Sequence, residues 1–243
     1  MPTPTANPTC RITIAFDNVA YDDQLTTSWG YAAMVECPGG NVLFDTGGMG
    51  SILVENLQRL GFDPASIQHV VLSHAHQDHY GGLDALARAG APASVYVFPA
   101  IQRALAGPFP GMEFVNVEAG MEIVPGVATS GMIGEAIPEQ ALVVDAAEGL
   151  VILTGCAHPG IARMVRAVKE LFQEEVYLVM GGFHLGRAST AIIEETIEEL
   201  QILGVDHVAP SHCTGDAARQ LFQEAFGEDY FPAGAGQVFI ISL

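Results

Sequence analysis

One short stretch carries the densest group of metal-ligand side chains in the sequence. The segment HAHQDHYGG, residues 74–82, holds three histidines and an aspartate within six positions and ends on two glycines. If His74 and His76 lie in extended backbone, their spacing turns both imidazoles to one side, where they can share a metal ion. Asp78 and His79 then emerge from the following turn toward a neighbouring point. This arrangement suits two adjacent cations that share a hydroxide.

Most other histidines occupy similar positions, where an apolar run stops and small residues begin. Six of the eight do so: His74, His76, His79, His158, His184 and His212. Sites gather at the carboxyl ends of strands in layered α/β proteins, so these six are expected near one site. His69 and His207 each precede a motif histidine by five residues inside a predicted strand. That odd spacing directs them to the opposite face, and both are interpreted as structural.

The elements that must position these side chains follow from hydrophobic periodicity. Strands are predicted at 11–16, 31–36, 42–45, 69–74, 93–98, 176–182, 205–212 and 237–242, with a hairpin over 141–155. Helices are predicted at 51–62, 83–89, 160–172, 189–204 and 216–227. The glycine- and proline-rich region 107–140 is expected to be mostly β-structure or loop.

Strand-rich segments followed by β/α segments, twice in succession, indicate an α/β (α+β) protein with two packed sheets and helices outside. No linker-like stretch separates the two halves, so residues 1–243 are predicted to form one domain.

Composition and charge restrict the partners. The chain has 28 acidic and nine basic residues, a formal net charge of -19, and a single lysine, Lys169. Such a surface repels nucleic acids and anionic membranes, which favours a small-molecule substrate. The polar start has no apolar export segment, and no run of about 18 apolar residues occurs. We therefore expect a cytoplasmic protein, with its oligomeric state left open.

Four cysteines are widely separated and form no CxxC pair. They are Cys10, Cys37, Cys156 and Cys213. This spacing argues against a disulfide framework or a structural zinc knuckle. Cys213 directly follows His212, so in extended backbone its side chain is expected to point away from the site and fill the core.

Several motifs resemble those of a known family. LSHAHQDHYGG (72–82) and LFDTGG (43–48) resemble the signatures of the metallo-β-lactamase fold superfamily. LTGCAHPG (153–160), GGFHL (181–185) and SHCTG (211–215) are similar to a branch of metal-dependent hydrolases related to dihydropterin-methyl-ribofuranosylaminobenzene phosphate synthase. The resemblance implies a four-layer αββα sandwich with a dinuclear metal site at one edge of the two sheets.

The resemblance also implies roles for the matching residues. His74 and His76 would bind the first metal ion. Asp78, His79 and His212 would bind the second, with Asp78 also counted among the catalytic groups. Asp45 would orient a ligand, as metal-bound histidines usually require; its alternative interpretation is an ordinary turn-capping aspartate.

The chain departs from the family pattern in two places. No histidine occurs between His79 and His158, and the family's TGD triplet is TGC here, with Cys156. Either His158 or His184 must then supply the third nitrogen to the first metal, and an orderly ligand set favours His158. Cys156 is either a soft thiolate ligand or a buried thiol that only fills space, and we favour the second because His158 lies in the same turn.

Three further residues are candidates for contact with substrate. Arg187 can meet an anionic group bidentately, although a solvated arginine is an equal alternative. The loop that contains Thr214 leads into the last predicted helix and offers free N–H groups to an anion. Cys156 is the third candidate. His184 can act as a metal ligand, as a proton donor to the leaving group or as a hydrogen-bond donor to substrate.

Metal-assisted hydrolysis fits these residues. Two divalent ions, zinc before iron or manganese, would lower the pKa of a shared water toward about 7. The hydroxide formed would attack a small ester, phosphoester, lactone or thioester, phosphorylated substrates included. The alternatives are an iron-dependent redox enzyme on the same scaffold and a noncatalytic metal-bound sensor or binding protein.

Overall fold

Two β-sheets form the centre of the computed structural model, which describes residues 8–105 and 109–243. The first sheet has the strand order β13-β1-β2-β3-β4-β5-β6. Its strands are β1 (Thr9–Phe16), β2 (Ala32–Cys37), β3 (Gly40–Phe44), β4 (His69–Val71), β5 (Ser94–Val97), β6 (Glu113–Asn116) and β13 (Val238–Ser242). Strands β3 to β6 are parallel, whereas β13, β1, β2 and β3 pair antiparallel.

The second sheet has the order β12-β11-β10-β9-β8-β7. Its strands are β7 (Met121–Val124), β8 (Val127–Thr129), β9 (Leu142–Val144), β10 (Leu150–Thr154), β11 (Val176–Gly182) and β12 (Val205–Ser211). Strands β10, β11 and β12 are parallel, and the remaining pairs are antiparallel. The region expected to be β-structure or loop supplies β6, β7 and β8, while its residues 107 and 108 lie outside the described ranges.

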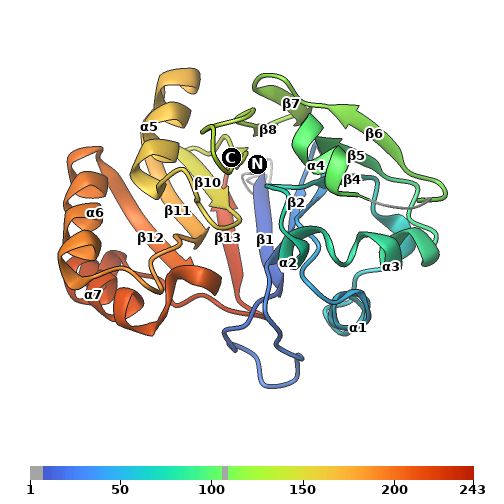
Figure 1. Ribbon diagram of the computed structural model, residues 1–243, viewed down its shortest axis with the longest axis horizontal. Helices are drawn as coiled ribbons and strands as arrows, with labels where there is room; N and C mark the ends of the chain where they lie inside the picture. The colour runs from blue at the N-terminus through green and yellow to red at the C-terminus, as the bar shows by residue number, and fades with distance from the viewer. Residues whose placement is uncertain (1–7, 106–108) are drawn as a thin grey trace, which may run out of the picture.

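Helices cover the outer face of each sheet, except the single-turn α2, which lies at the edge that carries the motif of residues 74–82. They are α1 (Gly50–Arg59), α2 (Gln77–Tyr80), α3 (Leu83–Arg88), α4 (Pro99–Ala104), α5 (Ile161–Phe172), α6 (Thr190–Ile202) and α7 (Asp216–Phe226), with 3-10 turns η1 (Pro64–Ser66), η2 (His212–Thr214) and η3 (Gly227–Asp229). Figure 1 shows α5, α6 and α7 along one flank and α1 and α3 along the other, with both sheets between them. The predicted four-layer αββα sandwich is confirmed.

Helix α6 shows why these segments fold as they do. Ser189 lies just before the helix and its hydroxyl accepts a hydrogen bond from the Ile192 N–H, which caps the first turn. Ile193, Ile197 and Leu200 share one face and are buried. The glutamates lie on other faces of the same helix, so the helix packs by its apolar stripe alone.

Three apolar clusters hold the layers together. The first fills the space between the two sheets and includes Ile12, Val35, Leu153 and Leu178. The second joins α5, α6 and α7 to the second sheet, and the third joins α1 and α3 to the first. Full burial of such side chains stabilises the fold by about 1.5–3 kcal/mol each. The edge of the sandwich that carries the site therefore rests on a rigid support.

The expectation of unpaired cysteines is wrong for two of the four. Cys10 and Cys37 form a disulfide, with Cα atoms 4.3 Å apart. They lie on the adjacent antiparallel strands β1 and β2, where Arg11 pairs with Glu36, so strand register brings together residues 27 positions apart. Strand register is a tertiary property, so cysteine spacing alone could not predict this pairing.

The prediction of a cytoplasmic location stays a prediction, and a disulfide is unusual in a reducing compartment. Residues 1–7, part of the polar start on which that prediction rested, lie outside the described ranges. Within those ranges, every helix is too short or too polar to cross a lipid bilayer. The prediction of a single domain over 1–243 also stays a prediction.

Candidate metal centre

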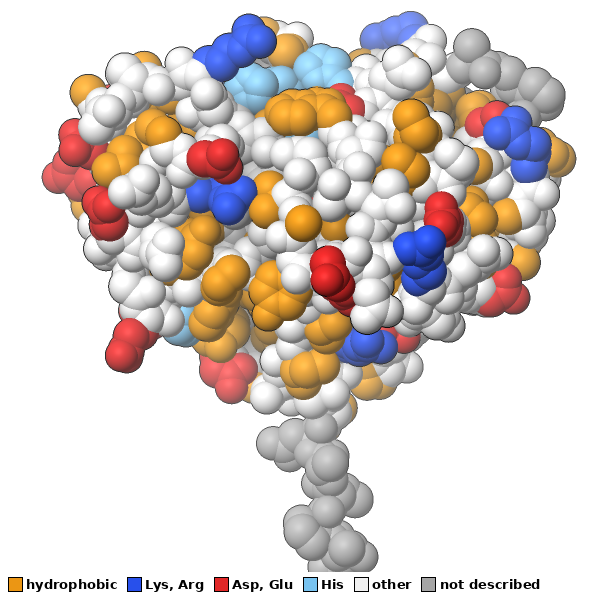
Figure 2. Space-filling view, turned by 90° about the horizontal axis from the view of Figure 1, so that it is seen from below, with side chains coloured by type: hydrophobic (Ala, Val, Ile, Leu, Met, Phe, Trp, Pro, Cys, Tyr) orange, Lys and Arg blue, Asp and Glu red, His pale blue; other side chains and the backbone are white. Residues whose placement is uncertain are grey.

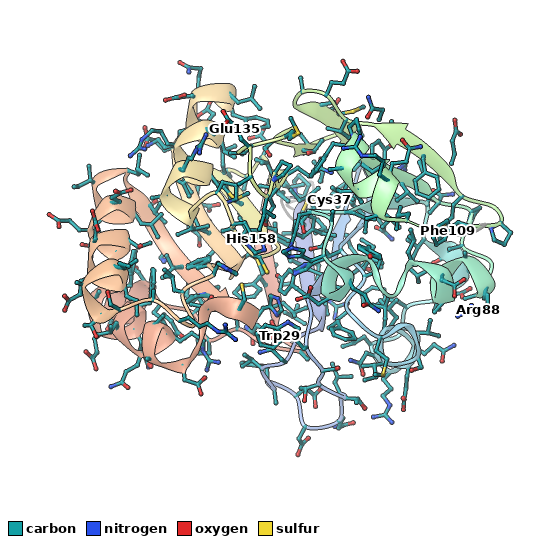
Figure 3. The ribbon with its side chains drawn as sticks, in the orientation of Figure 1. Trp29, Cys37, Arg88, Phe109, Glu135 and His158 are labelled. Atoms are coloured by element: carbon teal, nitrogen blue, oxygen red, sulfur yellow. A yellow bond between two sulfur atoms is a disulfide. The ribbon has the colours of Figure 1, made fainter. Side chains whose placement is uncertain are left out.

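The candidate site lies where the carboxyl ends of parallel strands from both sheets meet. Asp45 follows β3, the motif that begins with His74 follows β4, Cys156 and His158 follow β10, His184 follows β11 and His212 follows β12. Figure 3 places His158 at the seam between the two halves of the sandwich. These histidines lie together beyond the ends of strands, as their positions after apolar runs predicted.

Three imidazoles converge on one point at this seam. The Nδ1 atom of His76 lies 3.0 Å from Nε2 of His74 and 3.1 Å from Nε2 of His158. Nitrogen ligands lie about 2.0–2.1 Å from a zinc ion, so two that share an ion are less than about 4.2 Å apart. The three nitrogens therefore have the spacing of ligands to a single ion.

The route by which His74 and His76 meet differs from the expected one. Strand β4 ends at Val71, residues 74 and 75 form a bend, and His76 is the extended residue just before the single-turn helix α2. The two rings come together through this irregular backbone and not through strand alternation. A Cβ at Gly82 would clash with the Thr46 carbonyl, and the φ of Gly82 is negative. Glycine is therefore required here because the two backbone segments approach closely, and not because of an unusual backbone conformation.

A second group forms beside the first. Asp78 Oδ2 lies 3.6 Å from His79 Nε2 and 3.5 Å from His212 Nε2. The ligand atoms of these three residues and the sulfur of Cys156 all lie within 4.8 Å of one another. His212 Nε2 is buried and has no hydrogen-bond partner among the described residues, which costs free energy unless a ligand completes it. A metal ion fits this orphaned nitrogen.

Oxygen atoms contact the Nδ1 atoms of the buried residues His79 and His74, on the side of each ring away from the site. Asp45 Oδ2 lies 2.7 Å from Nδ1 of His79. Ser73 Oγ lies 2.9 Å from Nδ1 of His74. When each Nδ1–H donates to these oxygens, Nε2 is the nitrogen directed into the site, and it is free to bind a metal ion in the neutral imidazole.

Asn18 does the same for His212, with its Oδ1 atom 2.6 Å from the Nδ1 atom of the ring. Sequence reasoning missed Asn18, which lies in the loop after β1 and shares no motif with its partner. Asp45 also accepts hydrogen bonds from the N–H and hydroxyl of Ser73, at 2.6 and 2.7 Å. The structure thus places Asp45 behind a candidate ligand, in the position the resemblance implied.

Burial and neighbouring histidines keep the first group of ligands, His74, His76 and His158, neutral. Burial and the neighbouring histidines hold the pKa of His74 well below its usual range, and the same causes lower the pKa of His158 to about 4. Burial is also the main cause of the lowered pKa of His76. Neutral imidazoles are the form that binds metal, so these three are ready to act as ligands near neutral pH.

The second group behaves differently because it contains carboxylates. Burial opposes charge on His79, but the charge and hydrogen bond of Asp45 outweigh it and raise the pKa of His79 to about 9. Burial likewise opposes charge on Asp78, yet the imidazoles of His212 and His79, 3.5 and 3.6 Å from its Oδ2 atom, hold the pKa of that carboxyl well below its usual range. Asp78 is therefore an anionic ligand candidate.

Glu139 is a further buried carboxylate that sequence reasoning missed. Its Oε1 atom accepts the N–H groups of Cys156 and Ala157, both at 2.9 Å, and its Oε2 atom accepts that of His158 at 3.0 Å. The glutamate fixes the turn that delivers Cys156 and His158 to the site. It lies in the region without periodicity, so only the fold could reveal it.

Backbone strain concentrates at the site. Of the five non-glycine residues with positive φ in the described ranges, four belong to it: Asp45 (59°), Ala157 (59°), His184 (54°) and His212 (48°). Such conformations cost about 1–3 kcal/mol each and persist where the surrounding structure enforces them, most often at functional sites. The strain sets the directions of these side chains.

His184 and Cys213 lie at the outer margin of the centre. The His184 ring is exposed and lies 4.1 Å from that of His158, centroid to centroid, so His158 and not His184 is the residue placed against His76. The expectation that Cys213 points away from the site is wrong. Residues 212–214 form the 3-10 turn η2, and the Cys213 sulfur clusters with His184 and Cys156.

A cavity of about 550 Å³ opens beside the centre. Its lining includes His184, His212, Trp29, Arg187 and Arg219. Trp29 is 58% exposed, and its ring centroid lies 4.9 Å from that of His212. Figure 2 shows histidine side chains reaching the surface at one edge of the molecule, with apolar and basic side chains around them.

Thr214, a candidate for substrate contact, is fully buried. Its hydroxyl accepts the Phe183 N–H at 3.0 Å, so the side chain supports the end of β11 and has no path to a substrate. His69 and His207 lie outside the centre, against Tyr96 and Phe231 respectively, as their spacing predicted.

Comparison with known proteins agrees with this geometry. The model of the Metallo-beta-lactamase superfamily matches residues 30–163, more than half of the chain. The chain belongs to this superfamily. One relative is a 7,8-dihydropterin-6-methyl-4-(beta-D-ribofuranosyl)-aminobenzene-5'-phosphate synthase from Methanocaldococcus jannaschii. It is 28% identical to this chain, and the match covers 93% of this chain and 94% of the synthase.

Two solved structures extend the comparison. A metal-dependent hydrolase of the beta-lactamase superfamily is 28% identical with a TM-score of 0.80, and the match covers 96% of this chain and all of that one. A diphosphatase from the PhnP family, 16% identical with a TM-score of 0.65, shares the fold over 97% of this chain and 99% of its own.

Proposed function

We propose that the protein is a dinuclear metal-dependent hydrolase of small anionic substrates. The observation that carries this proposal is the pair of adjacent ligand groups, in which oxygens behind the rings of His74, His79 and His212 set the inward nitrogens. His74, His76 and His158 form the first group. Asp78, His79 and His212 form the second.

Two bound divalent ions would supply Lewis acidity and lower the pKa of a water to about 7, so that it becomes a nucleophile at neutral pH. Zinc is the proposed metal because imidazole nitrogens dominate the donor set, with iron and manganese as alternatives. A closed structural site has four ligands and no open position, whereas this centre opens onto a cavity.

The chain's own residues contribute orientation and proton transfer. Asp45 holds His79 and Asn18 holds His212, so the ligand directions are fixed before a substrate arrives. His184 lines the cavity next to His158 and is the proposed proton donor to the leaving group. Its left-handed backbone conformation, φ 54°, sets the direction of the ring.

The lining of the cavity supports a small anionic substrate. Arg187 and Arg219 both line it, although the whole chain has only nine basic residues and a net charge of -19. Two guanidinium groups beside a metal centre suit a phosphate or carboxylate, and the exposed Trp29 ring suits a planar group. The name of the synthase relative includes a 5'-phosphate, which supports a phosphorylated small molecule. The overall charge argues against nucleic acids and anionic membranes as partners.

The test is a hydrolysis panel of phosphomonoesters, phosphodiesters, lactones and thioesters with zinc-loaded protein. At least one class should be turned over, and chelation followed by added zinc should abolish and restore the rate. His76→Ala should abolish activity, because it removes the nitrogen shared by the first group. His69→Ala, at the start of β4 and outside the centre, is the matched control and should keep the rate.

The synthase relative favours a second candidate, in which the same centre joins two substrates. In that case the panel gives no hydrolysis, and a product forms only when a second substrate is added. An iron-dependent redox enzyme would show an iron absorption spectrum and no hydrolysis. A noncatalytic sensor would bind both metals and turn over nothing, and either result would contradict the hydrolase proposal.

A further inference from the structure

The sulfur of Cys156 lies between the two ligand groups. It lies within 4.8 Å of the ligand atoms of Asp78, His79 and His212, and within the same distance of those of His74 and His158. Its nearest polar contact is Nε2 of His79, at 3.2 Å. A donor atom that reaches both groups occupies the position of a bridging ligand.

The backbone holds the sulfur in this position. Glu139 accepts the N–H groups of Cys156 and of the next two residues, and Ala157 has a strained φ of 59°. A Cβ at Gly155 would clash with the Ser73 hydroxyl, so glycine permits the turn to approach the motif after β4. A thiol that only filled space would not require this degree of fixation.

Charge favours the same conclusion. Two divalent ions bring four positive charges into a largely buried site, and among the six nitrogen and oxygen ligands only Asp78 carries a negative charge. Burying uncompensated charge is costly. A thiolate between the groups supplies a second negative charge where it acts on both ions.

We infer that Cys156 binds both ions of the proposed centre through its sulfur as a bridging thiolate. This inference rests on the proposed function and revises the interpretation of Cys156 as a space-filling thiol. On metal binding the thiol S–H bond breaks, its proton passes to solvent, and two sulfur electron pairs form the two metal–sulfur bonds. A soft bridge selects zinc or iron over hard ions such as magnesium.

Cys213 provides a matched control within the same site. Its sulfur lies 3.6 Å from the carbonyl oxygen of Cys156 and clusters with His184, but it reaches neither of the two ligand groups. Both thiols are buried, at 3% and 8% exposure, and neither is in a disulfide. The two thiols are thus similarly buried, but only that of Cys156 lies against the two ligand groups.

The experiment is absorption spectroscopy of the cobalt(II)-loaded protein in thiol-free buffer, with cobalt content measured in parallel. Wild type should bind two cobalt ions and show a thiolate-to-cobalt charge-transfer band in the near ultraviolet. The band should be lost in Cys156→Ser and kept in Cys213→Ser. Cys156→Asp offers a carboxylate bridge, and it should bind two ions without the band, which separates loss of sulfur from loss of metal.

Each other outcome has a definite meaning. Two cobalt ions in wild type without the band would overturn the thiolate bridge and leave the dinuclear centre standing. A band that survives in Cys156→Ser, or that is lost in Cys213→Ser, would assign the sulfur ligand to Cys213 and overturn the inference. Failure of wild type to bind cobalt would contradict both the bridge and the proposed function.

Discussion

Replacing Asp45 by asparagine tests whether the groups behind the ligands control metal binding. Asp45→Asn preserves shape, and its Oδ1 atom can still accept the Ser73 N–H. The change replaces Oδ2 by an amide NH2, which cannot accept from the Nδ1–H of His79. The amide instead donates to Nδ1, which moves the proton of His79 to Nε2, the atom that faces the second metal position.

The expected magnitude follows from the lost contact. A hydrogen bond to a charged group contributes about 1.5–3 kcal/mol, and loss of such an orienting partner weakens metal binding by about 10- to 100-fold, or about 1.4–2.8 kcal/mol. The larger effect should fall on the second ion, because Asp45 contacts His79 directly and reaches the first group only through the Ser73 hydroxyl, which lies against His74. The first ion should lose much less.

The assay is competition for zinc against a chromophoric chelator, which resolves two dissociation constants. Asp63→Asn is the matched control, since Asp63 is an exposed cap of η1 before β4 and asparagine caps equally well. Equal weakening of both ions, or unchanged affinity for both, would refute the proposed coupling between Asp45 and the second position.

Three further predictions concern the turn, the cavity and proton competition. Glu139→Gln should lower the free energy of unfolding by about 1–3 kcal/mol, because its amide NH2 would face the His158 N–H and leave that donor without an acceptor. Urea titrations measure this change, and an unchanged unfolding midpoint would contradict it. Arg219→Ala should raise KM for an anionic substrate about 10-fold or more with little change in kcat, whereas a fall in kcat alone would argue against a binding role. The pKa of His79 is raised to about 9, so it is protonated below that pH in the metal-free protein. Affinity for the second ion should therefore fall about tenfold per unit of decreasing pH, and a flat zinc-binding profile from pH 6 to 9 would refute it.

Local patterns predicted the elements well. The apolar stripe of Ile193, Ile197 and Leu200 predicted α6, and the position of each histidine after an apolar run predicted the edge at which they gather. These features depend on short-range periodicity, which the sequence shows directly. The pairing of His74 with His76 is also local, although its bent backbone was not anticipated.

Features that depend on register or on long-range contact could not be predicted. Cys10 meets Cys37 only through the alignment of β1 with β2. Glu139 reaches the turn at Cys156 through a fully buried side chain, and no motif links these two positions. Cys213 joins the site because η2 replaces extended backbone, a change of local geometry that moves the side chain to another face.

The most direct test of the account is the metal stoichiometry of the chain after equilibration with zinc and removal of free ions, measured by elemental analysis. Two zinc ions per wild-type chain, with at most one per chain in His212→Ala, are the predicted result, since His212 belongs only to the second group. A wild-type chain that retains no zinc, or a His212→Ala variant that retains two ions, would contradict the convergence of two ligand groups on two metal positions.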